Sequence, residues 1–383
     1  MKIAYIGDFI NHGDILSTSG TPIVFLLARL KEVDEVAVFC PYKNGKTEQI
    51  DIPEKIKVTE TYRYGNFRSV IGILGLDFRQ FDRVIFNLLP GAFGKSALSN
   101  TIGLILPIIF SKFCGIKGVE VIYHNSAYTT DLNGIGWNTS TDKLKILVLR
   151  YIEKLLFRNV KTFVLLKIYQ ERIKKKIPDS KVFFLDGRYL EAITTVIQNG
   201  LLESEFFVSQ QTNNLPSVLL HGSWNPQKNL GIALKALSNL RNRGVKFSLT
   251  ISGSLNANFP NYKIEFETLM KQYSTIIDRY LGRVDEKDMF ALFSSSDLII
   301  LPYNSPGGHS GVIETGNFFE NRIIAIDFPE FEEQSAGSKL ISLVKEEDIE
   351  SAIGTVLSMK FENRTISVKK KVEETLSNIK ALI

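Results

Sequence analysis

A glycine-rich corner in the last quarter of the chain carries the clearest chemical pattern. Gly307, Gly308 and Gly311 lead into a predicted helix that holds Glu314 in its first turn. Glycines let the backbone come close to a ligand, and the first N–H groups of a helix lack partners within it, so this corner suits a phosphate. The Glu314 carboxylate can accept hydrogen bonds from a sugar or ribose hydroxyl. An acidic residue also suits a helix N-terminus for electrostatic reasons alone.

The elements around this corner follow a repeated pattern. It lies between two apolar strands, 296–303 and 321–326, which together predict a β-α-β unit. Three earlier predicted strands also end in glycine-containing turns, at Gly222, Gly253 and Gly282. Since the carboxyl ends of parallel strands share one edge of a sheet, this half of the chain is expected to have a binding edge.

A second group of polar residues follows strands in the first half. His124 and Asn125 come directly after the predicted strand 119–123, and an imidazole at that end of a strand stands where ligands usually bind. The loop 8–20 follows strand 2–6, and Thr21 is expected to cap a helix with Pro22 at its first position. The last part of this loop, Ser17 to Gly20 at the helix N-terminus, is a second candidate for holding a polar ligand, although it also fits a plain connection.

Two nucleotide-binding motifs are excluded by spacing. The loop 8–20 lacks the G-x-G-x-x-G pattern, which disfavours a nicotinamide dinucleotide site. The stretch 90–96 contains a Gly-Lys-Ser sequence but has Leu89 where a P-loop needs its first glycine, so we interpret it as an ordinary turn and helix start.

Composition indicates a globular protein of two α/β domains. The chain has 383 residues, 44% of them apolar and 23% charged, which is enough for two cores. Cys40 and Cys114 lack metal-like spacing, so neither a disulfide framework nor a zinc site is expected. The stretch 186–216 is less patterned and is interpreted as an interdomain linker.

No segment is expected to cross a membrane. The N-terminus has no signal-peptide pattern, and the longest apolar run, 102–110, is well short of the roughly 20 residues that a spanning helix needs. We therefore expect a cytoplasmic protein.

Positive charge is concentrated in one stretch. Residues 143–181 contain 12 basic and three acidic residues. In the predicted helix 141–158, Lys143, Arg150, Lys154 and Arg158 recur on one face and apolar residues fill the other. This fits a core-packed helix with a solvated side. It also fits attraction to anionic lipid, which contributes about 1 kcal/mol per basic residue, so peripheral association with the inner face of a membrane is a further expectation.

Together these motifs resemble the GT-B glycosyltransferases of the large family 4 type, which act with retention. The specific part covers residues 217–327, where Gly222 to Asn229, Gly253, Gly282 to Val284 and Ser310 to Glu314 occur in the family's order. The resemblance implies an α/β fold with two Rossmann-like domains whose parallel sheets face each other across a cleft. The implied domains are 1–195 for the acceptor and 196–364 for the nucleotide sugar, with a C-terminal helix, 365–383, that packs back on the first.

The resemblance also implies roles for individual residues. Lys228 and the backbone amides of Gly308 to Gly311 would bind the diphosphate, Glu314 the ribose, and Arg283 and Val284 would flank the base. The implied catalytic residues are His124, His309 and Lys228. The other implied donor-site residues are Gly222, Ser223, Gly253 and Ser310, and those on the acceptor side are Gly20, Thr21, His124 and Asn125.

Two positions depart from the family pattern. Pro306 stands where the first glutamate of the E-x7-E motif is expected, and Ser223 stands where an arginine usually pairs with the lysine. Lys228 is then the main cation, so either Arg283, His309 or another side chain substitutes, or the donor binds weakly.

The resemblance implies transfer of a hexose from a nucleotide-diphosphate sugar, a UDP-sugar, to a lipid-linked or glycan acceptor. There is no Asp-x-Asp motif, so neither a metal nor another cofactor is expected. A non-catalytic nucleotide-sugar or glycan-binding protein and a sugar-nucleotide epimerase on a similar fold stay open as alternatives. The basic first half would also suit a DNA-modifying transferase, but its amphipathic spacing favours lipid, and no nucleic-acid partner is expected.

Overall fold

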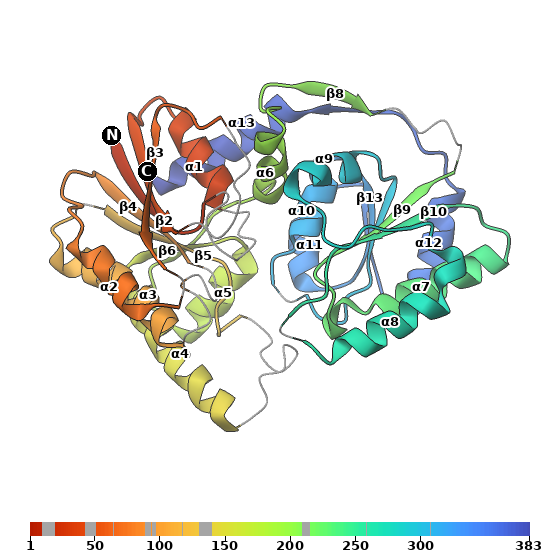
Figure 1. Ribbon diagram of the computed structural model, residues 1–383, viewed down its shortest axis with the longest axis horizontal. Coiled ribbons are helices and arrows are strands. Elements are labelled where there is room, and N and C mark those ends of the chain that lie inside the picture. Colours follow the sequence, from red (N-terminus) through yellow and green to blue (C-terminus); the bar gives the residue numbers. More distant parts are fainter. Residues whose placement is uncertain are drawn as a thin grey trace. The chain divides into compact units, whose positions relative to one another are not determined.

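The structure is a computed structural model that describes residues 1–9, 20–42, 51–63, 65–88, 93, 97–116, 118–129, 140–208, 215–257, 259–306 and 308–383. It forms two compact units (Figure 1). The first unit contains Met1–Leu190 and Glu373–Ile383, and the second contains Glu191–Val372. The sequence had suggested boundaries near residues 195 and 364.

The first unit contains a parallel sheet of seven strands in the order β3-β2-β1-β4-β5-β6-β7. This is the doubly wound order, in which the direction of winding reverses between β1 and β4. The strands are β1 Lys2–Ile6, β2 Glu35–Pro41, β3 Ile56–Tyr62, β4 Arg83–Leu88, β5 Gly118–Tyr123, β6 Lys161–Val164 and β7 Val182–Phe184.

Helices cover both faces of this sheet, with α2, α3 and α4 on one side and α1 and α13 on the other (Figure 1). Alternate strand residues such as Ala4 and Ile6 pack with the apolar sides of α2 to α5 in one continuous core. The helices are α1 Gly20–Arg29, α2 Phe67–Gly72, α3 Ala97–Phe113, α4 Ser140–Asn159, α5 Lys167–Lys176 and α13 Val368–Ile379, with short 3₁₀ turns at Ile73–Gly75 and Lys380–Leu382.

The second unit repeats this architecture with a parallel sheet in the order β11-β10-β9-β12-β13-β14. The winding reverses between β9 and β12. The strands are β9 Ser217–His221, β10 Ser248–Ser252, β11 Arg279–Tyr280, β12 Leu298–Leu301, β13 Arg322–Ile326 and β14 Ile341–Val344. A separate antiparallel pair joins β8 Glu205–Val208 to β15 Arg364–Ser367.

In the second unit, α7, α8 and α12 lie on one side of the sheet and α9, α10 and α11 on the other (Figure 1). The helices are α6 Leu190–Gln198, α7 Leu230–Asn242, α8 Tyr262–Gln272, α9 Glu286–Ser294, α10 Gly311–Phe318, α11 Pro329–Ser335 and α12 Ile349–Ser358. The 3₁₀ turns are Pro226–Lys228, Ser274–Ile276 and Glu346–Asp348. Gly316 lets α10 approach the sheet, since a Cβ there would lie 2.8 Å from Ile323.

Three expectations about elements were wrong. The stretch 186–216 is not a plain linker, because it contains α6 and β8, and β8 is formed only by pairing with the distant β15. The strand expected at 276–281 is reduced to two residues, since a 3₁₀ turn occupies its start. The first helix begins at Gly20, so Thr21 lies within its first turn and does not cap it.

Candidate functional site

A lysine lies at the reversal point of the second sheet. Lys228 ends the 3₁₀ turn after β9, which Asn225 caps by accepting a hydrogen bond from the Gln227 N–H at 2.8 Å. Its ammonium lies 3.6 Å from the centre of the Tyr303 ring, which follows β12. Asn304 N–H donates to the Gln227 carbonyl at 3.0 Å, so the two loops are joined directly.

The charge of this lysine has no counter-ion among the described residues. Burial lowers the pKa of Lys228 to about 7, with no carboxylate acting against it. His221 lies nearby, but burial and the Lys228 charge lower its pKa to about 4, so it is neutral at pH 7. An anionic ligand would supply the negative counter-charge that is missing beside Lys228.

Bare backbone surrounds this position. A Cβ on Gly222 would lie 3.8 Å from the Tyr303 hydroxyl and 3.9 Å from Lys228 Cε. Gly253 has φ +106°, and a Cβ there would lie only 1.8 Å from the Gly222 carbonyl oxygen. The Gly253 N–H in turn donates to the Gly282 carbonyl at 2.5 Å. The ends of β9, β10 and β11 therefore meet as glycines, and Gly253 accepts no side chain.

The start of α10 is fixed by Ser310 and Gln334. Ser310 is the N-cap residue, and its hydroxyl accepts from the Ile313 N–H at 3.4 Å. Gln334 on α11 accepts from the Ser310 N–H and donates to the Ser310 carbonyl, at 3.0 and 3.1 Å. Gly308 is buried at the same turn, Gly311 packs against Glu191 of α6, and the predicted Gly307 lies outside the described residues.

Tyr303 connects this helix start to the lysine. Burial raises the pKa of Tyr303, and the Ser310 hydroxyl near its phenol acts in the opposite direction. The ring therefore has Lys228 over its face and Ser310 near its hydroxyl. The lysine and the glycine-lined corner, far apart in the sequence, lie at one place in the second unit.

Glu314 and His309 form a buried pair beside this corner. His309 Nε2 lies 2.5 Å from Glu314 Oε1, and the Glu314 side chain is 3% exposed. Burial lowers the pKa of His309, but the carboxylates of Glu314, Glu191 and Glu333 outweigh it, so the pKa of His309 is raised overall. Within the described ranges no other donor reaches the Glu314 carboxylate. The carboxylate can therefore accept hydrogen bonds from the hydroxyl groups of a ligand.

The remaining predicted donor residues lie further out. Arg283 is exposed and Val284 half-buried after β11, at the edge of the sheet and two strands from β9. Ser223 is exposed beside Gly222. No ion pair or ring contact involving Arg283 is seen in the described part of the chain. The structure therefore gives no contact that would place the Arg283 guanidinium beside Lys228.

The predicted acceptor-side residues gather at the strand ends of the first unit. His124 follows β5, and its Nε2 lies 2.7 Å from Asn87 Oδ1 of the neighbouring β4. Because a carbonyl oxygen only accepts, Nε2 is the donor nitrogen in this contact. Gly20 starts α1 close to β1, since a Cβ there would lie 2.1 Å from the Asp8 carbonyl oxygen. Thr21 is buried, and Asn125, next to His124, is half-buried.

Several site residues were missed from the sequence. Asn87, Tyr303 and Gln334 look like ordinary residues of a strand, a turn and a helix. Two further polar atoms in the loops after β9 and β12, Gln227 Nε2 and Ser305 Oγ, are buried without a hydrogen-bond partner in the described structure. Only the position of Tyr303 and Ser305 after a buried strand gave a usable signal.

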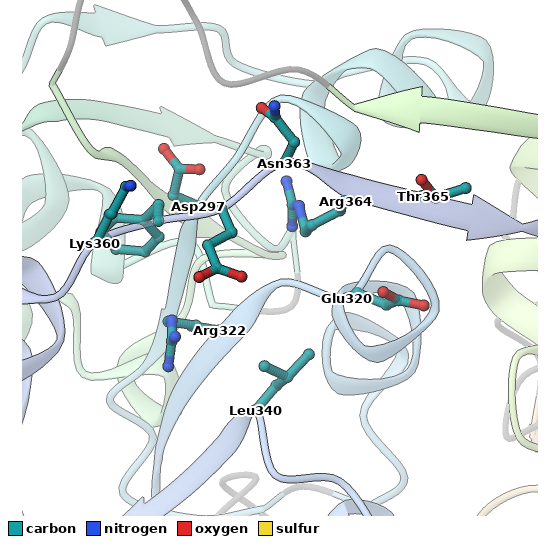
Figure 2. A pocket seen from close by; sticks show the side chains of 10 residues that line it. Asp297, Glu320, Arg322, Leu340, Lys360, Asn363, Arg364 and Thr365 are labelled. Carbon is teal, nitrogen blue, oxygen red and sulfur yellow. The ribbon is translucent and has the colours of Figure 1, made fainter.

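A hollow of about 360 Å³ opens at the opposite edge of the second sheet (Figure 2). It adjoins the first residue of β13 and Asp297, which directly precedes β12. Its charged lining residues are Asp297, Glu320, Arg322, Lys360, Glu362 and Arg364. The three cations and three carboxylates balance, so the lining has no formal net charge. This hollow is therefore less suited to a diphosphate than the Lys228 site.

No group of three or more His, Cys, Asp or Glu residues that could hold a metal ion is found in the described part of the chain. No helix in the same ranges is long and apolar enough to span a bilayer.

Comparison with solved structures shows the fold. The chain is similar to sucrose-phosphate synthase from Thermosynechococcus elongatus, with 13% identity and a TM-score of 0.65 over 100% of this chain and 94% of that one. It is also similar to Anabaena Alr3699/HepE in complex with UDP-glucose, with 11% identity and a TM-score of 0.61 over 100% and 98% of the two chains.

A third similar structure is the UDP-GlcNAc 2-epimerase from Neisseria meningitidis bound to UDP-GlcNAc, with 13% identity and a TM-score of 0.54 over 99% and 94% of the chains. No protein-family model matches the chain, and no curated protein matches its sequence. The likeness extends over both units, and the chain has the GT-B fold.

Proposed function

We propose that this protein is a retaining glycosyltransferase of the family 4 type that transfers a hexose from a nucleotide-diphosphate sugar, a UDP-sugar, to a lipid-linked or glycan acceptor. The observation that carries the proposal is the cation of Lys228, without a counter-ion among the described residues and set against bare glycine backbone at the reversal point of the second sheet. Open α/β sheets bind ligands at this point. Two proteins of similar structure hold UDP-glucose and UDP-GlcNAc.

The proposed chemistry follows from the leaving group. A nucleoside diphosphate gains negative charge as its bond to the sugar breaks, so a fixed cation or donor at that oxygen lowers the barrier, by about 3–4 kcal/mol per donor in comparable sites. Lys228 and the start of α10 supply this stabilisation, and we propose that the reaction needs no metal ion. The Glu314 carboxylate, near His309, accepts hydrogen bonds from the ribose hydroxyls.

The first unit supplies the acceptor side. His124 is held by Asn87 at the end of β5, and we propose that it faces a hydroxyl of the donor sugar or the acceptor. Gly20, Thr21 and Asn125 complete this side of the proposal.

A panel of nucleotide sugars tests the function. We expect the chain to release UDP from one UDP-sugar and to transfer the sugar to an added alkyl glycoside or lipid-linked acceptor. Release of UDP with inversion at C2 of the sugar and no acceptor would select the epimerase alternative. Donor binding without turnover would select a non-catalytic binding protein. If no nucleotide sugar binds, the proposal is wrong.

A lipid-linked acceptor is favoured by the surface of α4. The structure buries only part of the apolar face of this helix: Leu156 lies in the core, whereas Leu144, Leu147 and Tyr151 are 64%, 67% and 64% exposed. Phe113, at the end of α3, is 78% exposed. A row of exposed apolar side chains flanked by exposed lysines is typical of helices that lie in the surface of an anionic membrane. We propose that α4 holds the protein at such a surface, on the cytoplasmic side.

Vesicle sedimentation tests this surface. The variant Leu147→Glu/Tyr151→Glu is expected to bind vesicles of phosphatidylcholine and phosphatidylglycerol at least about 100-fold more weakly, since burying each side chain contributes about 1.5–3 kcal/mol. The control variant is Ile264→Glu, because Ile264 is 75% exposed on α8 in the other unit. The surface proposal fails if Leu147→Glu/Tyr151→Glu binds vesicles like the parent chain, if Ile264→Glu is weakened equally, or if duplex DNA binds more tightly than vesicles.

A further inference from the structure

A buried carboxylate lies on the inner side of α4. Glu153 is fully buried, and its side chain accepts hydrogen bonds from the Tyr123 hydroxyl and the Ser126 hydroxyl, both at 2.8 Å. The Ala127 N–H lies 2.9 and 3.1 Å from its two oxygens. All three donors come from the end of β5 and the loop that follows it. Glu153 therefore binds the segment that contains His124.

A second residue of α4 holds the same loop. Arg150 precedes Glu153 by three residues, so both lie on one side of the helix. Its Nε donates to the Ala127 carbonyl at 3.1 Å, and its own carbonyl accepts from the Tyr128 hydroxyl at 3.0 Å. Both polar groups of Ala127 are thus bonded to side chains of α4.

The segment is also anchored on its other side. His124 donates its N–H to the Leu88 carbonyl at 3.1 Å, and its ring is bonded to Asn87, so it is attached to β4. Only Asn125 separates this attachment from the one to α4. The positions of the two acceptor-side residues are therefore fixed between β4 and Glu153.

On the basis of the function proposed above, we propose that Glu153 is a positioning residue for glycosyl transfer: its ionised carboxylate holds the segment from Tyr123 to Ala127 so that His124 and Asn125 face the acceptor. The reacting groups themselves are not touched by Glu153. Its effect passes through the loop.

The charge state of Glu153 can change near neutral pH. Burial raises its pKa to about 7, although the bonds from Ala127, Ser126 and Tyr123 and the charge of Arg150 act in the opposite direction. The other titratable groups that face it are Tyr123 on β5, whose pKa is raised by burial and by Glu153, and Tyr128 in the loop, whose pKa is raised by the same causes. Both stay neutral near pH 7. A protonated Glu153 carries an O–H on one oxygen, so the Tyr123 or Ser126 hydroxyl bound there must rotate to accept it, and the charge that strengthens the remaining bonds is lost.

The test uses Glu153→Gln in the full chain, because glutamine keeps the shape and removes the titration. The control is Glu120→Gln, which alters another buried glutamate of the first unit, on β5 and paired with Arg83. In the parent chain and in the control, we expect the NMR backbone amide signals of Asn125 and Ala127 to titrate together with a midpoint near pH 7. In Glu153→Gln this shared step should be absent, while thermal unfolding stays cooperative.

The kinetic readout is UDP release from the donor that the parent chain turns over. Above pH 7 we expect Glu153→Gln to be on the order of 10- to 100-fold slower, to lose the acid limb of the pH profile and to bind UDP unchanged. Equal loss of UDP binding and turnover would overturn the positioning role, as would an Asn125 signal that does not follow Ala127. If the parent chain turns over no donor, the proposed function fails, whereas the amide titration still decides whether Glu153 controls the loop.

Discussion

The variant Lys228→Met is expected to bind UDP about 10- to 100-fold more weakly than the parent chain, since a hydrogen bond to a charged group contributes about 1.5–3 kcal/mol. Turnover should fall further, by about 10²- to 10³-fold, because the lysine acts on the charge that develops on the leaving group. Methionine keeps the apolar stem against Tyr303 and removes only the ammonium. Calorimetry with UDP and a UDP-release assay measure the two effects.

The matched control is Lys235→Met, which removes an exposed lysine of α7 in the same unit. It should bind UDP and turn over donor like the parent chain. The role of Lys228 is wrong if its methionine variant also behaves like the parent, or if both variants lose the same affinity through net charge alone.

The affinity for UDP-glucose is expected to fall as pH rises above 7, by about tenfold per pH unit. Burial lowers the pKa of Lys228 to about 7 in the free protein, so above this pH most molecules have a neutral lysine. A bound diphosphate raises the pKa of Lys228, and binding must then take up a proton. Calorimetry in buffers of different ionisation enthalpy measures that uptake. UDP-glucose is the suitable ligand, because its diphosphate does not titrate near pH 7.

The lowered pKa of Lys228 also affects folding, and there the dependence on pH is the opposite one. The folded protein binds fewer protons at Lys228 than the unfolded chain between pH 7 and the ordinary lysine pKa, so this residue makes the fold more stable as pH rises through that range. In Lys228→Arg the charge does not titrate, and the pH dependence of UDP-glucose binding should become flat above pH 7. A parent chain with pH-independent binding, or an arginine variant with the same slope, would contradict the pKa shift.

Local patterns predicted much of the architecture. Apolar runs predicted β9, β10, β12 and β13, whereas β11 is shorter than predicted and β14 was not predicted. The order of the glycine-containing turns carried the resemblance to the GT-B fold. The shared edge of β9, β10 and β12 follows from parallel pairing alone. Because Lys228 and Ser310 each follow or flank such an edge, their proximity was accessible from the sequence.

Contacts between segments that are distant in the chain could not be predicted from the sequence. β8 forms only because β15 pairs with it, and neither segment is strongly patterned by itself. The apolar residues of α4 have the spacing of a core helix, and only the fold shows that Leu147 and Tyr151 are exposed while Glu153 is buried. Asn87 gave no signal, because its partner His124 lies on another strand.

The return of the chain to the first unit has a consequence for folding. Ile379 and Leu382 are fully buried there, and Lys380 pairs with Glu32 at 3.5 Å. This closing segment is synthesised after every residue of the second unit. During translation the second unit can therefore complete its core while the first still lacks one of its helices, so the domain that begins first is the one that matures last.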